Sequence, residues 1–360
     1  MHDTIVRNNQ IKLTDSELKR KIRESIPKSA HKRLEWKILL LIPFVLSIIG
    51  MSILIINLES WLLMIPASIV LGLIYSSFAL FGHEIGHGAV VKSKTIQHFS
   101  LYLTFLIFFL SPTLWFVWHN GVHHGNTNID DADPDIPGFL HKFENILIMR
   151  TIQRLFPGTR HWLCIFYLPT FFTLHGQAIL WHRSKHPLFN RLNRTVAFTE
   201  MFIMLGFWIA LGIAVGFVNS IFMIIIPMMI SNAIAMSYIA TNHQLRSLSE
   251  ERVDILDNTM SVSTFKVLDI IHFNFSHHVE HHLFPSMNSR YLPRVRKSII
   301  DLEPDRYLAP THWLAMKYLA TTPRLYLDGE HLTDMEGRRK VNIREIEHTL
   351  LHSTKKIYQT

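Results

Sequence analysis

Four long apolar segments constrain the fold of this 360-residue chain more than any other feature. They cover residues 38–56, 61–81, 196–218 and 220–240, so each has 19 to 23 residues. A helix needs about 20 apolar residues to cross the hydrocarbon core of a bilayer. The sequence therefore predicts an all-α integral membrane protein with four transmembrane helices.

The four predicted spans form two hairpins with short turns, at residues 57–60 and at Asn219. Neither turn contains Lys or Arg, whereas basic residues flank the other ends of both hairpins. By the positive-inside rule, both turns face outward and all other segments face the cytoplasm. The flanking basic residues are Lys19, Arg20, Lys21, Arg23, Lys28, Lys32, Arg33, Lys37, Lys92, Lys94, Arg191, Arg194, Arg246 and Arg252.

Two further apolar stretches, residues 99–118 and 162–181, are interrupted by Pro, Gly or His. We predict that both are half-inserted or interfacial, because a single additional crossing would separate the histidine-rich segments on opposite sides of the bilayer. The alternative for either stretch is an ordinary transmembrane helix. We expect residues 1–37 to form a cytoplasmic N-terminal segment, residues 38–300 a membrane and catalytic domain, and residues 301–360 a cytoplasmic extension.

The composition limits the chemistry that the chain can perform. Its single cysteine, Cys164, excludes an internal disulfide framework and a thiolate metal cluster, so any metal site uses nitrogen or oxygen ligands. The net charge of +8 comes from basic residues that lie beside apolar spans. Anionic lipid headgroups are therefore the simpler partner, and we expect no binding to nucleic acid.

The 23 histidines include three short clusters: FGHEIGHGAV at 81–90, WHNGVHHGNTNIDDADPDIP at 118–137 and NFSHHVEHHLFPSM at 274–287. Residues three or four apart share one face of a helix. The spacing therefore predicts that His83 with His87, His119 with His123, and His278 with His281 each grip one ion. The adjacent His124 and His282 add donors to their clusters, and His243 stands alone at the end of the fourth predicted span.

Two kinds of metal site fit these clusters differently. Read alone, His83-Glu84-x-x-His87 is the signature of a zinc hydrolase with Glu84 as general base. A catalytic zinc needs only about three protein ligands, however, and zinc has no redox chemistry. Nine imidazoles instead suit two ions with four or five nitrogens each. The sequence thus favours a cytoplasmic helical cap with a histidine-rich dimetal site.

HEIGH, HNGVHH and HVEHH, in this order and separated by hairpins, resemble the three histidine boxes of the membrane fatty acid desaturases over about residues 35–300. HNGVHHGNTNIDDADPDI and HHVEHHLFPSM are similar to the second-box and third-box regions of acyl-lipid and front-end members. The resemblance implies two non-haem irons. Their implied ligands are His83, His87, His119, His123, His124, His243, His278, His281 and His282.

The chain departs from the front-end pattern in three respects. His278 stands where those members usually carry Gln, and Glu84 stands where Asp is common in the first box. The His-Pro-Gly-Gly motif of their fused haem domain is absent from these 360 residues. We therefore expect electrons to come from a separate ferredoxin or b-type cytochrome. The candidates for docking this carrier, or for binding headgroup or cofactor phosphates, are Arg290, Arg294, Arg296 and Lys297. The alternative is that these residues only complement the charge of the lipid.

The resemblance implies an O2-dependent desaturase that introduces a cis double bond into a fatty acyl chain carried on lipid, coenzyme A or a carrier protein. A related diiron hydroxylase or ketolase, the zinc hydrolase and a non-catalytic metal protein are the alternatives. We expect a bacterial inner membrane location, with the endoplasmic reticulum as the alternative. Apolar segments such as 99–118 could wall an acyl tunnel.

Polar residues near the clusters are candidates to orient the imidazoles. For the aspartates among them, the alternative is a solvated turn around Asp133-Pro134-Asp135. The candidates are Glu84, Asn126, Asp130, Asp131, Asp133, Asp135, Asn242 and Glu280.

Overall fold

The structure, a computed structural model, describes residues 12–251 and 253–358. Residues 1–11 and 359–360 of the predicted terminal segments, and the flanking Arg252, lie outside the described residues. The α-helices are α1 (Asp15–Ser25), α2 (Leu41–Ile56), α3 (Trp61–Gly86), α4 (Lys94–Thr104), α5 (Pro112–Trp115), α6 (Leu147–Gln153), α7 (Tyr167–Trp181), α8 (Arg194–Val215), α9 (Phe217–Ser220), α10 (Ile226–His243), α11 (Ile255–Asn258), α12 (Lys266–Ile271), α13 (His278–Leu283), α14 (Leu292–Leu302), α15 (His312–Thr321) and α16 (Ile343–Tyr358).

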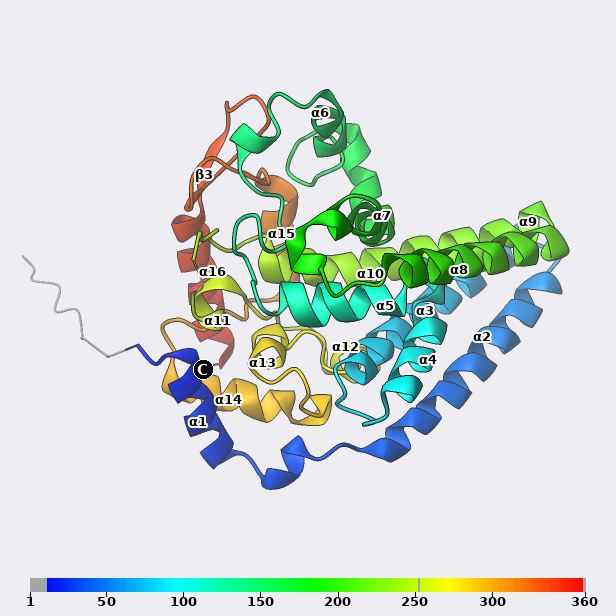
Figure 1. The fold of residues 1–360 in the computed structure, drawn as a ribbon, viewed down its shortest axis with the longest axis horizontal. Coiled ribbons are helices and arrows are strands. Elements are labelled where there is room, and N and C mark those ends of the chain that lie inside the picture. The colour runs from blue at the N-terminus through cyan, green and yellow to red at the C-terminus, as the bar shows by residue number, and fades with distance from the viewer. Residues whose placement is uncertain (1–11, 252, 359–360) are drawn as a thin grey trace, which may run out of the picture.

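Helices α2, α8 and α10 extend to one side of the molecule, and α1, α11, α14 and α16 gather at the other (Figure 1). The described residues contain five helical stretches long and apolar enough to cross a membrane: Glu35–Ile56, Trp61–Gly86, Trp162–Lys185, Arg194–Val215 and Phe217–His243. Four of them cover the predicted spans, which confirms a mostly helical chain with membrane-length helices. The fifth contains α7, so four crossings rather than five remains a prediction.

The two predicted hairpins are present, with one shifted turn. Helices α2 and α3 are joined by residues 57–60, as expected. The second turn lies at Gly216, between α8 and α9, and not at Asn219. Gly216 has a φ of 80°, a backbone conformation that glycine adopts without the steric cost of a side chain. The apolar pattern runs through this turn, so hydropathy alone did not locate it.

The stretch 99–118 does not form one straight helix. Helix α4 ends at Thr104, Phe109 adopts a φ of 51°, and α5 begins at Pro112. Side chains of neighbouring helices satisfy the interrupted backbone, as apolar surroundings require. The indole Nε1 of Trp208 donates to the Leu106 carbonyl at 2.7 Å, and Nε2 of Gln177 donates to the Phe109 carbonyl at 3.0 Å.

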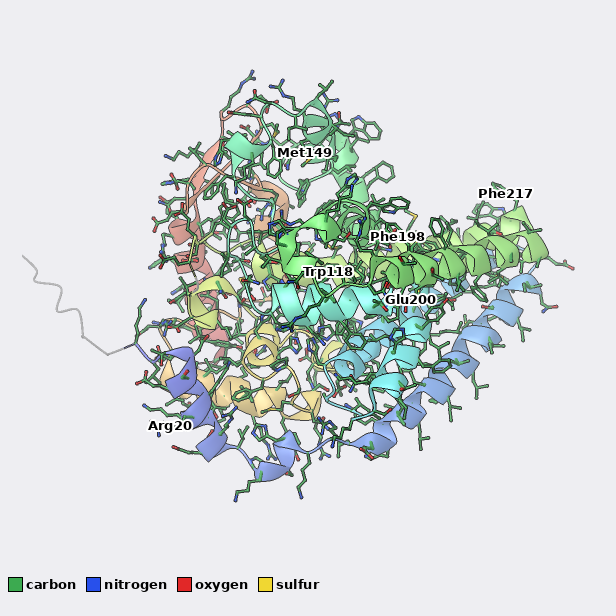
Figure 2. All side chains as sticks on the ribbon, viewed as in Figure 1. Arg20, Trp118, Met149, Phe198, Glu200 and Phe217 are labelled. Atoms are coloured by element: carbon green, nitrogen blue, oxygen red, sulfur yellow. The ribbon has the colours of Figure 1, made fainter. Side chains whose placement is uncertain are left out.

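Glu200 on α8 holds this broken segment in place (Figure 2). Its carboxylate contacts Nε2 of His98 at 2.7 Å and accepts from Oγ of Ser111 at 2.5 Å. It also accepts from the backbone nitrogen of Thr113 at 3.1 Å and from its hydroxyl at 2.9 Å. Because α5 continues into the helix that carries the second histidine cluster, Glu200 fixes where that helix begins.

Replacing Glu200 with Ala is expected to lower the free energy of unfolding by about 2 kcal/mol or more, because several donors lose their acceptor in an apolar environment. Thermal unfolding in detergent measures this as a lower midpoint temperature. Phe217→Ala is the control, since Phe217 lies at the far tip of the same hairpin and is 81% exposed (Figure 2). An equal midpoint for both variants would contradict the role of Glu200.

The C-terminal extension contains a small antiparallel sheet, so the all-α prediction was wrong in this detail. Its strands are β1 (Leu325–Tyr326), β2 (His331–Thr333) and β3 (Lys340–Asn342), paired in the order β1-β2-β3. Tyr326 pairs with Leu332, and Leu332 pairs with Val341. Strands of two or three residues are too short to show an alternating pattern in the sequence.

The two ends of the described chain pack around the third histidine cluster. Helix α1 lies against α14, where Leu18 and Ile22 join Val295 and Ile299 in one apolar core. From the C-terminal extension, the hydroxyl of Tyr307 donates to Glu280 of α13 at 2.5 Å. These contacts hold α13 from the side away from the apolar bundle.

Candidate metal centre

The first histidine cluster occupies the last turn of α3. Glycines on one face of this turn allow neighbouring helices to approach closely. A Cβ on Gly82 would lie 2.0 Å from Oγ1 of Thr104, and one on Gly86 would lie 2.4 Å from the Trp115 ring. His83 and His87 lie one turn apart, and their Nε2 atoms are 3.2 Å from each other.

The second cluster lies on a π-helix, Phe116–His123. In an α-helix, residues five apart point about 140° away from each other. The wider π-turn instead hydrogen-bonds residues five apart, and here the His124 nitrogen donates to the His119 carbonyl at 3.1 Å. This brings His119 and His124 to the same side, with their Nε2 atoms 3.3 Å apart, while His123 points elsewhere.

The third cluster lies on α13 and divides between two groups. Nε2 of His278 is 3.1 Å from Nε2 of His282 and 2.7 Å from Nε2 of His243, at the end of α10. Nε2 of His281 is 3.2 Å from Nε2 of His124 in the second cluster. The predicted pair His278/His281 is therefore divided between the two groups. His119 and His123 also fall in different groups of four, although they form a smaller group with Asp135.

All nine predicted histidines come together, although they are far apart in the sequence. In each group of four, the potential ligand atoms lie within 4.8 Å of one another. The first group is completed by His124, through its contacts with two members. The groups are His83, His87, His119 and His281, and His123, His243, His278 and His282.

The separations between these nitrogens test whether metal ions fit. An imidazole nitrogen binds a metal at about 2.0–2.1 Å, so two nitrogens at right angles on one ion lie about 3.0 Å apart. The closest nitrogen pairs in the two groups are 2.7 to 3.3 Å apart. Imidazole nitrogens within each group therefore lie at the separations expected of ligands bound to the same ion. The residues fit two metal ions, one in each group.

Burial keeps most of these imidazoles in the neutral form that metal binding needs. It lowers the pKa of His119, His124, His278, His281 and His282 well below the usual value, and the neighbouring imidazoles add to this effect. At neutral pH their nitrogens are therefore available as lone-pair donors.

Comparison with known proteins places the chain in a family. A model of the fatty acid desaturase family matches residues 59–314, which is more than half of the chain. The chain belongs to the fatty acid desaturase family. It is also similar to the sn-1 oleoyl-lipid 12-desaturase of Picosynechococcus sp., with 24% identity over 290 residues, 75% of this chain and 79% of that protein. The predicted family is thus confirmed, and with it an oxidoreductase in a membrane setting.

Two aspartates orient one of the imidazoles in this desaturase-family site. His123 is buried, and its Nδ1 lies 2.9 Å from Oδ1 of Asp133 and 3.2 Å from Oδ2 of Asp135. Burial acts to lower the pKa of His123, but the two carboxylates raise it to about 9. The two carboxylates hold the hydrogen on Nδ1, so Nε2 faces the group, and a metal ion bound there would displace the proton on Nε2.

Asp133 and Asp135 are themselves held firmly. Asp133 is 3% exposed and accepts from the backbone nitrogens of Asn128 and Asp135 at 2.8 and 3.0 Å. Asp135 accepts from Nε1 of Trp118 at 2.8 Å and contacts Nε2 of His175 at 3.1 Å. The solvated-turn alternative is wrong for these two residues.

The other predicted orienting residues have different partners in the described part of the chain. Asp130 and Asp131 pair with Lys142, and Asn126 donates to the Val122 carbonyl. Glu280 pairs with Arg296. Both polar side-chain atoms of Asn242 are buried without a hydrogen bond among the described residues. Sequence proximity was therefore a poor guide to which polar groups reach an imidazole.

Glu84 does not have the surroundings of a hydrolase base. Both its carboxylate oxygens contact Nζ of Lys37 at 2.8 Å, and Oε1 accepts from the backbone nitrogen of Ser289 at 3.1 Å. This buried ion pair ties α3 to the N-terminal segment and to the chain after α13. The arrangement engages the carboxylate structurally and gives no support to the zinc hydrolase alternative.

Thr127 contacts one of the histidines, and the sequence patterns did not predict this contact. Its hydroxyl lies 3.3 Å from Nδ1 of His282 and donates to the carbonyl of His123 at 3.0 Å. Thr127 follows His123 by four residues, and this spacing on the second cluster was the available signal. Thr127 thereby links the second and third clusters.

A mainly apolar cavity reaches both histidine groups. Its walls include Phe105, Phe108, Trp115 and Trp118 from the predicted tunnel-forming stretch 99–118. Helix α7 adds residues that the sequence did not indicate. His83, His119, His123, His243 and His278 line the same cavity. The cavity thus borders both groups. The contributions of α7 are Phe171, Phe172 and His175.

Proposed function

We propose that this chain is a membrane-bound, O2-dependent desaturase that introduces a cis double bond into a fatty acyl chain by means of a histidine-ligated diiron centre. The observation that carries the proposal is the convergence of two groups of imidazole nitrogens at the wall of one aromatic cavity. Membership of the fatty acid desaturase family, whose members generally depend on two irons, supports it.

In this proposal, the two groups supply the ligands of two irons. The shortest distance between two of the proposed ligand nitrogens is 2.7 Å, from Nε2 of His278 to Nε2 of His243, so these two residues are assigned to the same iron. One iron would be held by His83, His87, His119, His124 and His281, and the other by His123, His243, His278 and His282. When bound, the irons supply the reduction of O2 that removes two hydrogens from adjacent carbons of the acyl chain.

The remaining tasks fall to the protein's own residues. The aromatic walls, such as Phe108, Trp118 and Phe172, exclude water and hold the acyl methylenes beside the histidines. Asp133 keeps the His123 ring in one orientation throughout turnover. The position of the double bond then depends on how far the chain enters the cavity before its end meets the wall.

Two electrons for each turnover come, in this proposal, from a separate ferredoxin or b-type cytochrome. The exposed Arg290, Arg294 and Lys297, around the start of α14, remain candidates for docking it. Arg296 is no longer a candidate, because it is buried and its Nε donates to Glu280 at 2.8 Å. We also propose that residues 38–300 form the membrane and catalytic domain, and that residues 1–37 and 301–360 lie in the cytoplasm.

The test is expression in a bacterium that makes no unsaturated fatty acids, followed by mass spectrometry of its fatty acids. New double bonds that disappear in His123→Ala are expected. Hydroxylated acids in their place would instead identify a lipid hydroxylase. A profile without new products, with both types of electron donor supplied, would overturn the proposal.

The proposal places all histidine clusters on the cytoplasmic side of a membrane, which we take to be the bacterial inner membrane, with the endoplasmic reticulum as the alternative. In a Cys164→Ser background, Glu59→Cys and Phe217→Cys should react with an impermeant maleimide in intact cells. Asn190→Cys, and Cys164 in the unmodified chain, should react only after the cells are opened. Labelling of Cys164 and Asn190→Cys from opposite sides would mean that α7 crosses the bilayer.

A further inference from the structure

A second pocket adjoins the apolar cavity beside the histidine groups, and His175 on α7 lines both. One part of its lining is apolar and includes Phe143, Met149 and Ile179. Met149 projects from α6, above α7 in Figure 2. We call this second pocket the α7 pocket. Because the two spaces share His175, a molecule in the α7 pocket lies next to the cavity that reaches the histidine groups.

The other part of the α7 pocket is strongly basic. His182, Arg183, Lys185 and His186 follow α7 directly and line the pocket. The nearby acidic residue Asp131 is already paired with Lys142, whose Nζ lies 2.8 Å from its Oδ2. The pocket therefore presents an excess of positive charge, suited to a phosphate or a similar anionic group.

The α7 pocket lies at the level where lipid headgroups are expected. Arg194, the first residue of the apolar helix α8, donates from Nε to Oγ of Ser184 at 3.1 Å, so α8 begins beside the basic segment. Large apolar side chains near the pocket are exposed, among them Leu147 at 80% and Ile148 at 66%. Basic groups beside exposed apolar side chains are typical of the membrane interface.

We propose that the α7 pocket binds the anionic headgroup of a glycerolipid whose acyl chain passes His175 into the cavity beside the histidine groups. This inference rests on the proposed desaturase function and names the carrier of its substrate. The apolar side of the pocket contacts the glycerol and the first methylenes, and Lys185 and Arg183 contact the phosphate. The substrate is thus drawn from the bilayer and is not a water-soluble thioester.

The test compares acyl carriers and charge variants in nanodiscs, with the electron donor supplied. The same acyl chain is offered on phosphatidylglycerol, on a neutral galactolipid and on coenzyme A. Lys185→Glu is expected to raise KM for the phosphatidylglycerol-linked chain about tenfold, because one attractive charge becomes repulsive. Turnover of the neutral lipid should change little. Native mass spectrometry of the purified variant should also show loss of retained phosphatidylglycerol.

Lys92→Glu is the matched control, because Lys92, like Lys185, is an exposed lysine that follows a long apolar helix, here α3. It makes the same change in charge away from α7 and should leave KM unchanged. An equal rise in KM for both variants would mean that general surface charge attracts the lipid, and would overturn the inference.

Two further outcomes separate this inference from the proposed function. Turnover of acyl-coenzyme A alone would overturn the lipid carrier and leave the desaturase standing. If no carrier yields product, the proposed function fails. The retention of phosphatidylglycerol then still tests whether the α7 pocket binds a lipid headgroup. Equal phosphatidylglycerol retention in the unmodified and Lys185→Glu proteins would then overturn it.

Discussion

Replacing His278 with alanine is expected to abolish desaturation and to reduce bound iron from two ions per chain to about one. Nε2 of His278 lies 2.7 Å from that of His243 and 3.1 Å from that of His282, so its removal opens the second group at its centre. Loss of an outer-sphere partner alone costs about 10–100-fold in metal affinity or activity, so loss of a ligand should cost on the order of 100-fold or more. Iron analysis and fatty acid analysis of one preparation measure both effects.

His277→Gln is the matched control for this variant. His277 is also buried and precedes His278 directly, but its Nδ1 contacts Oγ of Ser276 at 3.0 Å and it belongs to neither metal-binding group. It should retain both irons. A zinc hydrolase centred on the first cluster does not use His278, so it predicts that His278→Ala keeps full activity. Full activity of this variant would contradict the proposed diiron centre.

Replacing Asp133 with asparagine is expected to lower activity by about 10–100-fold and to weaken iron binding without removing any ligand. The buried carboxylate accepts from Nδ1 of His123 at 2.9 Å and fixes the ring that supplies Nε2 to the second group. An amide of the same size can direct its NH2 group toward this nitrogen, which favours the wrong tautomer of the imidazole. Iron loss during titration with a chelator, followed alongside turnover, measures the effect.

Asp305→Asn provides the comparison for Asp133→Asn. The Asp305 side chain is 69% exposed and pairs with Lys355 at the surface, where an ion pair contributes little. Its iron retention should match that of the unmodified protein. If Asp133→Asn retained iron equally well, the carboxylate would have no orienting role.

The sequence predicted the parts of the site that depend on local patterns. Apolar segments of membrane length identified the helices that carry His83, His87 and His243 at their ends. The order of the three motifs identified the family. Each apolar segment and each motif is a contiguous run of residues, so no knowledge of tertiary contacts was needed to read them.

The division of the histidines into groups could not be read in the same way. The prediction assumed α-helical spacing, but the second cluster winds as a π-helix, which also brings His119 and His124 to the same side. Likewise, Asp133 contacts His123, ten residues before it, because the chain folds back after the second cluster. Glu84 is adjacent to His83 in the sequence, yet its carboxylate pairs with Lys37. These choices depend on tertiary contacts between residues far apart in the sequence.

The shape of the acyl cavity was also beyond the sequence. Helix α7 contributes Phe171 and Phe172 to its wall, although this stretch carries no motif that connects it with the histidines. The small sheet of residues 325–342 was missed because its strands have only two or three residues, and alternation of apolar and polar residues is read over about four or more.

The metal content of the purified protein tests the central claim most directly. Elemental mass spectrometry, combined with quantitative amino-acid analysis, should find two irons per chain, bound by the nine imidazoles. A preparation that is active on acyl chains but contains a single zinc and no iron would contradict the account.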